Sequence, residues 1–345
     1  MGRILAVLLT LVVLASCSAE SPPPRSEPRT PVGLRQIEFH DPNGPDGERL
    51  LALSVFYPAE APQDSAQPFT MPFFTGLGSH RDLTPTGRRR PLLLFSHGRG
   101  SNALYYAWFA EAMARRGYIV AGINHYRANT YDSSIDCLAN RLWQRPRDLT
   151  LAANHLVADE FWGPLIDPDR IGVVGHSQGG FTALWLGGAR VAPDRYLTFQ
   201  QGIKNNRMIP ESVRARLPLD AEPALDVADP RIRAVFAMAP GVIEDFGMTA
   251  DGLAQLRVPT HIMVGARDTQ TPPGPNAAFA AEHIPDAKLT VLEGDVDHEI
   301  FVNECTPLGR DEFPEACVDA PGVDRAAIHR DIAETAARFF DEHLG

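Results

Sequence analysis

Positive charge, cysteine and long hydrophobic runs are all scarce in this sequence. The 345 residues include 32 basic and 43 acidic side chains, which gives a formal charge of −11 with the histidines counted as neutral. An acidic chain of this kind offers little to a phosphate backbone, so a dedicated nucleic-acid-binding protein is excluded. The one long apolar run lies at the extreme N-terminus, which excludes a multi-pass membrane protein. With 44% hydrophobic residues, the chain can nevertheless bury a substantial core.

Two common cofactor signatures are also missing. The sequence has no G-x-G-x-x-G dinucleotide fingerprint, and no pairs of histidine and cysteine have the spacing of a zinc site. We therefore expect neither a metal nor an organic cofactor.

Residues 1–16 have the features of a secretory signal peptide. Arg3 gives a positive start, and Ile4–Ala15 is an apolar run that is too short for a comfortable membrane span. The tetrad Leu14-Ala15-Ser16-Cys17 resembles a bacterial lipobox, in which the cysteine is acylated and becomes the mature N-terminus. The alternative is an ordinary signal peptide that happens to contain a cysteine. We expect an exported protein held to a bacterial membrane through acylated Cys17, on the periplasmic face of the outer membrane if the cell is Gram-negative.

A tether and a single catalytic domain follow. Residues 17–31 are polar and rich in proline, so they predict an extended tether without a core, and residues 32–345 form the folded domain. Export makes the remaining cysteines informative, because disulfides persist in oxidising compartments. Cys305 and Cys317 would close a short loop, and we predict a disulfide between them. Cys137 is then a free thiol or an alternative partner of one of the two.

From Val32 onward, short β-rich runs alternate with helical ones. Several of the strands are continuous apolar runs, which is typical of strands buried on both faces of a parallel sheet. The expected strands are Arg35–Phe39, Leu51–Tyr57, Pro91–Ser96, Tyr118–Asn124, Arg170–Gly175, Arg233–Met238, Thr260–Val264 and Lys288–Leu292. The expected helices are Leu104–Arg116, Pro146–Ala158, Gly179–Gly187, Asn276–His283 and Arg325–His343. This alternation predicts an α/β fold with a doubly wound, mostly parallel sheet, whose first two strands form an antiparallel hairpin at its edge.

Residues 191–230 interrupt the alternation. This segment is rich in polar residues and proline and contains no clear strand. Because a structureless loop of this length is improbable inside a compact domain, we expect short helices that form a cap-like excursion.

A nucleophile motif occurs at Gly175-His176-Ser177-Gln178-Gly179, which matches G-x-S-x-G. An apolar strand runs directly into the motif and a helical run leaves it. A sharp strand-to-helix turn crowds its neighbours, which explains a glycine on each side, and it lifts the serine hydroxyl above the sheet edge. Ser177 is therefore the predicted nucleophile.

A serine nucleophile needs a base and a carboxylate that orients the base. His298 follows the last predicted strand and lies where the base is expected, whereas histidines inside helical runs are better explained by packing. Asp268, just after the strand Thr260–Val264, is the predicted acid, with Glu244 and Asp245 as alternatives. The catalytic set predicted from the sequence is Ser177, Asp268 and His298.

A glycine-rich turn, Ser96-His97-Gly98-Arg99-Gly100-Ser101, directly follows the strand that ends at Ser96. Backbone N–H groups in such a turn can face a developing oxyanion, and we expect the amides of Arg99 and Gln178 to act as donors. Among nearby aromatic residues, Tyr105, Tyr106 and Trp108 are expected in the core, whereas Tyr126 and Tyr131 are candidates for lining the acyl site.

These motifs resemble the α/β-hydrolase superfamily. The stretches Leu94–Gly100, Val55–Pro58 and His298–Phe301 are similar to bacterial relatives of platelet-activating-factor acetylhydrolases, often described as dienelactone-hydrolase-like. Animal acetylhydrolases of this type carry their acid after the preceding strand, where this chain has Met238-Ala239-Pro240, and this supports Asp268 as the acid. Dienelactone hydrolases use cysteine as nucleophile, so Ser177 argues against that substrate.

We therefore expect a serine esterase that acts on a small or short-chain acyl ester. One alternative keeps the chemistry but takes a lipid or polyester substrate, as lipases do. An alternative of another class is a catalytically silent binding protein with the hydrolase fold.

Overall fold

The computed structural model describes residues 30–44, 47–63, 65–134, 141–215 and 226–345. Cys17, the predicted signal peptide and Cys137 lie outside the described residues.

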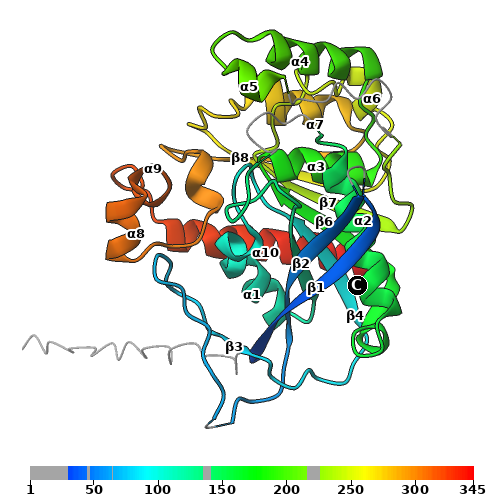
Figure 1. The fold of residues 1–345 in the computed structure, drawn as a ribbon. Helices are drawn as coiled ribbons and strands as arrows, with labels where there is room; N and C mark the ends of the chain where they lie inside the picture. The colour runs from blue at the N-terminus through cyan, green and yellow to red at the C-terminus, as the bar shows by residue number, and fades with distance from the viewer. Residues whose placement is uncertain (1–29, 45–46, 64, 135–140, 216–225) are drawn as a thin grey trace, which may run out of the picture.

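A sheet of nine strands runs through this part of the chain, in the order β3-β1-β2-β5-β4-β6-β7-β8-β9 (Figure 1). Its strands are β1 (Val32–Gly44), β2 (Gly47–Pro58), β3 (Ser79–Arg81), β4 (Arg90–Ser96), β5 (Ile119–Asn124), β6 (Ile166–His176), β7 (Ile232–Met238), β8 (Thr260–Gly265) and β9 (Lys288–Leu292). From β5 to β9 all neighbours pair in parallel, whereas β2 pairs antiparallel with both β1 and β5. The predicted mostly parallel sheet is confirmed. The antiparallel hairpin is present too, but the short β3 lies outside it, so β1 is not the edge strand.

Helical segments lie between these strands and after the last one. They are η1 (Ala103–Tyr106), α1 (Ala107–Arg115), α2 (Gln144–Ala158), η3 (Gly163–Leu165), α3 (Gln178–Gly187), α4 (Pro193–Asn205), α5 (Glu211–Arg214), α6 (Ala250–Leu253), η4 (Gly274–Ala278), α7 (Phe279–His283), η5 (His298–Phe301), α8 (Pro307–Glu312), α9 (Pro314–Cys317) and α10 (Arg325–Leu344). Each predicted helix corresponds to one or two of these segments.

Helices cover both faces of the sheet, as alternate residues of β7 show. Phe236 contacts Phe109 of α1 and Phe340 of α10, with ring centroids 6.3 and 6.1 Å away. Its neighbour Val235 faces α3, because a Cβ atom on Gly187 would lie 2.4 Å from a Val235 methyl group. Successive strand residues point to opposite faces, so α1 and α10 lie on one face and α3 on the other. The apolar strands that predicted a two-sided sheet are buried accordingly.

Helices α4 and α5 occur in the segment predicted to leave the alternation, within residues 191–230. Phe199 of α4 packs edge-on against Phe246, which follows β7, at 4.9 Å between ring centroids. The described part of the excursion therefore contains two helices, and α4 packs against the segment that follows β7.

Candidate active site

Ser177 lies at a tight turn between β6 and α3. Its backbone has φ 56° and ψ −121°, a strained combination for a residue with a side chain, and its N–H donates to the carbonyl of Met238 over 2.9 Å. A Cβ atom on Gly175 would lie 2.0 Å from the carbonyl oxygen of Gly179, and one on Gly179 would lie 2.0 Å from that of Ser96. No side chain fits at either position, so both glycines of the motif are required by the backbone packing.

His298 and Asp268 meet at the carboxyl edge of the same sheet. Nδ1 of His298 lies 2.6 Å from Oδ2 of Asp268, and both residues are only 3% exposed. A hydrogen bond of this kind leaves the proton on Nδ1 and Nε2 free to accept one. The alternative acids Glu244 and Asp245 are exposed. The structure thus brings the predicted acid to the predicted base.

Asp268 accepts further hydrogen bonds that the sequence analysis did not foresee. Its Oδ1 accepts from the backbone N–H groups of Gln270 and Thr271 over 3.0 and 2.7 Å. The Thr271 hydroxyl lies 2.9 Å from Oδ2 and also 3.2 Å from Nδ1 of His298. These donors fix the carboxylate on the histidine, and the sequence signal for them is the threonine three residues after the aspartate.

A cavity of about 360 Å³ joins the serine to the histidine, because Ser177 and His298 both line it. The glycine-rich turn forms another part of the wall, through Gly98, Arg99 and Gly100. A Cβ atom on Gly98 would lie 3.5 Å from Cβ of Ser177, so this turn passes directly beside the nucleophile. The predicted donor residue Arg99 therefore borders the same space as the serine hydroxyl. Gln178 begins α3, and the first N–H groups of a helix have no acceptor within the helix, which makes its amide suitable for an anion.

His176, the residue before the nucleophile, links three parts of the site. Its Nε2 lies 3.1 Å from the carbonyl oxygen of His298, which can only accept, so Nε2 carries the proton. Nδ1 must then accept from the Tyr106 hydroxyl at 3.0 Å, and that oxygen accepts from the Gly98 N–H at 3.1 Å. Burial holds the pKa of His176 well below its ordinary value, which favours this neutral form. This chain of bonds, and with it the role of His176, was not predicted from the sequence.

The segment that carries His298 is tied to α1 and α10. Nε1 of Trp108 donates to the carbonyl of Phe301 over 2.8 Å, and Nε2 of His329 donates to that of Ile300 over 2.7 Å. The two side chains stack, with ring centroids 3.7 Å apart and planes within 3°. Asn303, fully buried, accepts from the Trp108 N–H over 3.0 Å. Packing alone was expected of Trp108 and His329, whereas both also hold the backbone beside the base.

The outer wall of the cavity comes largely from the C-terminal part of the chain. The predicted disulfide is present, since Cys305 and Cys317 are joined with an S–S distance of 2.04 Å. Cys317, Phe313 and Ala316, around α9, line the cavity. Among the described residues of the excursion 191–230, none lines it. The described part of the cap-like segment therefore forms no part of the wall of this cavity, and α9 lines it instead.

The aromatic side chains at the cavity differ from those expected. Tyr105 and Tyr106 line it together with Phe74, whereas Tyr126 and Tyr131 do not. Tyr105 packs edge-on against Phe74 at 4.8 Å between ring centroids. Tyr106 is buried in the core as expected and also borders the cavity. The expectation was wrong for Tyr105, because the 3₁₀ helix η1 turns its side chain toward the cavity, which periodicity in an α-helix does not predict.

In the described residues, no group of three or more histidine, cysteine or acidic side chains could hold a metal ion. In the same residues, none of the helices has the length and apolar character needed to cross a bilayer.

Several known proteins are similar to parts of this chain. The family model of the prolyl oligopeptidase family matches residues 104–209. Platelet-activating factor acetylhydrolase of the dog (Canis lupus familiaris) is 28% identical over 29% of this chain and 32% of its own length. Dipeptidyl-peptidase 5 of Porphyromonas gingivalis is 29% identical over 29% of this chain and 15% of its own. The matches thus span about a third or less of these relatives.

A solved structure matches over nearly the whole chain. The ferulic acid esterase from Streptomyces cinnamoneus superposes with a TM-score of 0.63 at 21% identity, covering 92% of this chain and 91% of that one. At this identity the match concerns the fold. Together with the strand order and the turn at Ser177, it shows that the chain has the α/β-hydrolase fold, similar to that of esterases and peptidases.

Proposed function

We propose that this protein is a serine hydrolase that cleaves small or short-chain carboxylic esters through an acyl-enzyme intermediate. The observation that carries the proposal is that Ser177, on a strained turn, lines the same cavity as His298, whose Nδ1 is bonded to Asp268 over 2.6 Å. A binding protein with the same fold would have no need of this combination.

The chemistry follows from the proton positions. Nε2 of His298 takes the hydroxyl proton as Oγ of Ser177 attacks the ester carbonyl, and Asp268 stabilises the imidazolium that forms. The carbonyl oxygen becomes an oxyanion held by the amides of Arg99 and Gln178. The intermediate collapses when the alkoxide leaves with the proton from His298. Water then attacks the acyl-enzyme with the same histidine as base, which releases the acid and restores Ser177.

The cavity supports a small substrate. Its volume of about 360 Å³ is near the lower end of ligand pockets, which run from about 300 to 1,000 Å³. Phe74, Tyr105 and Phe313 offer an apolar wall for an acyl or aryl group. The names of two similar proteins, an acetylhydrolase and a ferulic acid esterase, also point to esters.

Peptide bonds are the second candidate, because the family model that matches residues 104–209 is that of the prolyl oligopeptidases. The mechanism is the same, but an amine is a poorer leaving group than an alkoxide.

A substrate panel tests the proposal. We would measure kcat/KM for p-nitrophenyl esters from acetate to palmitate, for methyl ferulate and for a prolyl p-nitroanilide, with Ser177→Ala as control. We expect a maximum at acetate to butyrate or at the aryl ester. A maximum at palmitate would instead identify a lipase, and a preference for the anilide would identify a peptidase. If no substrate were turned over in a Ser177-dependent way, the protein would be a binding protein.

We further propose that the mature chain begins at acylated Cys17 and is membrane-bound, a proposal that rests on the sequence alone. When the protein is produced in a bacterial host, we expect it to be labelled by palmitate and to partition into the detergent phase. Cys17→Ala should abolish both. An unlabelled, water-soluble wild-type protein would contradict the anchor.

A further inference from the structure

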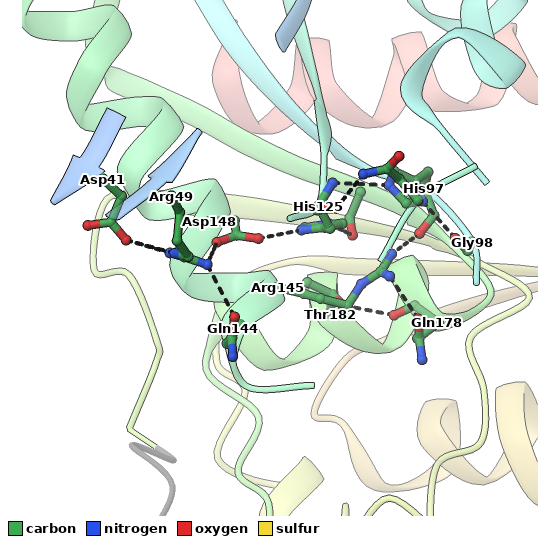
Figure 2. Close-up of polar contacts among 12 residues, drawn as sticks. Asp41, Arg49, His97, Gly98, His125, Gln144, Arg145, Asp148, Gln178 and Thr182 are labelled. Carbon is green, nitrogen blue, oxygen red and sulfur yellow. Dashed lines mark hydrogen bonds and ion pairs between the residues drawn. The ribbon is translucent and has the colours of Figure 1, made fainter. Parts of the chain in front are cut away.

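One buried side chain bonds to both segments that carry the expected oxyanion donors. Arg145, near the start of α2 and 3% exposed, donates from Nη1 to Oε1 of Gln178 over 2.7 Å. Its Nη2 donates to the carbonyl oxygen of His97, on the turn that leads into Arg99. Figure 2 shows the guanidinium of Arg145 between the two segments, with a dashed bond to each.

His97 holds the next peptide group of the turn. The backbone N–H of His125 points at Nε2 of His97 over 3.3 Å, so Nε2 is an acceptor and the ring proton is on Nδ1. Nδ1 then donates to the carbonyl of Gly98 over 2.7 Å. Burial, reinforced by the positive charge of Arg145, holds the pKa of His97 well below its ordinary value, so the ring stays neutral.

These bonds determine how the turn presents its amides. In a trans peptide the C=O and the following N–H point in opposite directions. The peptide between His97 and Gly98 is held at both ends, by Arg145 on its carbonyl and by the Tyr106 hydroxyl on its N–H at 3.1 Å. In the next peptide the carbonyl of Gly98 faces the His97 ring, so the N–H of Arg99 points away from that ring. Arg99 borders the cavity that Ser177 lines.

We propose that Arg145 is a positioning residue that fixes the amides of Arg99 and Gln178 relative to each other, with His97 setting the direction of the first. The two amides follow different strands, β4 and β6, and a planar guanidinium can bridge acceptors on both in a fixed geometry. Donors held in place before the reaction need no reorganisation when the oxyanion forms. This inference rests on the proposed ester hydrolysis.

The main test compares Arg145→Met with Arg147→Met, a control on the same helix. Arg147 is partly exposed and bonds to the carbonyl of Asn43, away from the cavity. Removing one oxyanion donor costs roughly 100- to 1,000-fold in kcat, so displacing both donors partially should lower the kcat of Arg145→Met about 100-fold, with KM within about threefold. Phenylboronic acid, which forms a tetrahedral adduct on the serine, should bind more weakly by a similar factor. Arg147→Met should change neither. A kcat within threefold of wild type, or a change in KM alone, would overturn the proposal.

Arg145→Lys covers the case in which Arg145→Met does not fold. Lysine keeps the buried positive charge but cannot hold both acceptors in the same geometry, so kcat should fall about tenfold. Wild-type kcat in Arg145→Lys would mean that charge alone suffices, and the bridging role would be wrong.

A measurement without turnover separates this inference from the proposed function. Hydrogen exchange in a peptide covering residues 97–101 should be faster in the Arg145 variants than in wild type, whereas a peptide covering β7 should be unchanged. If the wild-type protein hydrolyses no ester, the proposed function fails, yet faster exchange at 97–101 still supports the positioning role. Unchanged exchange there overturns that role whatever the activity.

Discussion

Two sets of serine, histidine and aspartate side chains stand out in the described part of the chain, and one of them borders the cavity of about 360 Å³. Besides the set at Ser177, Oγ of Ser96 lies 2.9 Å from Nε2 of His125, whose Nδ1 lies 3.0 Å from Oδ2 of Asp148. Because the carboxylate accepts from Nδ1, Nε2 of His125 accepts a hydrogen bond from the Ser96 hydroxyl, the same arrangement as in a catalytic triad.

Burial distinguishes the two sets. Ser96, His125 and Asp148 are at most 1% exposed, and none of them lines the cavity. Arg49, equally buried, holds Asp148 over 2.8 Å and Asp41 over 2.6 Å, so this group forms an internal polar network (Figure 2). If the proposed function holds, the hydrogen bonds within a set of serine, histidine and aspartate do not by themselves make the serine reactive. A strained turn, an open approach and nearby backbone donors are needed as well.

The largest expected difference between the sets is in the two serines. Ser177→Ala should lower turnover by about six orders of magnitude, because the nucleophile is lost. Ser96→Ala should keep activity within about tenfold, since its hydroxyl meets no substrate. Ester hydrolysis and labelling by a fluorophosphonate probe measure both. Labelling that survives in Ser177→Ala, or disappears in Ser96→Ala with the fold intact, would contradict the distinction.

The two aspartates should differ in what they affect. Asp268→Asn should lower kcat about 10⁴-fold, because the amide favours the wrong tautomer of His298, while the fold is retained. Asp148→Asn removes one of the two carboxylates that face buried Arg49, and because Asp41 still pairs with Arg49, the free energy of unfolding should fall by about 1 to 3 kcal/mol. Urea denaturation beside steady-state kinetics separates the effects. If Asp148→Asn lost activity while its free energy of unfolding stayed at the wild-type value, the set of Ser96, His125 and Asp148 would take part in catalysis, contrary to this prediction.

Removing the disulfide tests whether the wall of the cavity at α9 limits which substrates reach Ser177. Replacing Cys305 and Cys317 together by serine should lower the free energy of unfolding by at most about 3 kcal/mol, as expected for a short closed loop. Because Cys317 and Phe313 line the cavity, the preference among acyl chain lengths should broaden, with kcat for acetate within about threefold. An unchanged chain-length profile would show that α9 does not limit the substrate.

The smallest effect concerns pH and the buried histidines. Burial lowers the pKa of His125 well below its ordinary value, and that of His261 to about 4. Below about pH 6.5 these histidines therefore bind protons in the unfolded chain but stay neutral in the folded protein. The free energy of unfolding consequently falls as pH falls. Denaturation between pH 7 and 4.5 should show this slope, and His261→Gln, which can keep a bond to Thr290, should make it shallower. If the free energy of unfolding of His261→Gln fell with pH as steeply as that of the wild type, His261 would not contribute to the pH dependence.

The sequence predicted those features that depend on local pattern. Apolar runs predicted the strands, and the two glycines around Ser177 predicted a crowded turn, which is present in the structure. The acid and base were predicted because each follows a strand. The hydrogen bonds of Arg145 and Tyr106 and the wall at α9 were not predicted, because the partners in these contacts are distant in the chain and no periodicity marks them. His176 shows the limit well: it stands inside the motif, yet its bonds depend on Tyr106 and His298.

The covalent link between Cys305 and Cys317 closes a wall of the cavity, and neither cysteine is among the residues expected to react. Protein produced in a reducing cytoplasm and protein secreted into an oxidising medium could thus hydrolyse a small test ester equally well and still rank larger esters differently. Kinetic data from separate preparations become comparable only when the thiol content of each has been titrated.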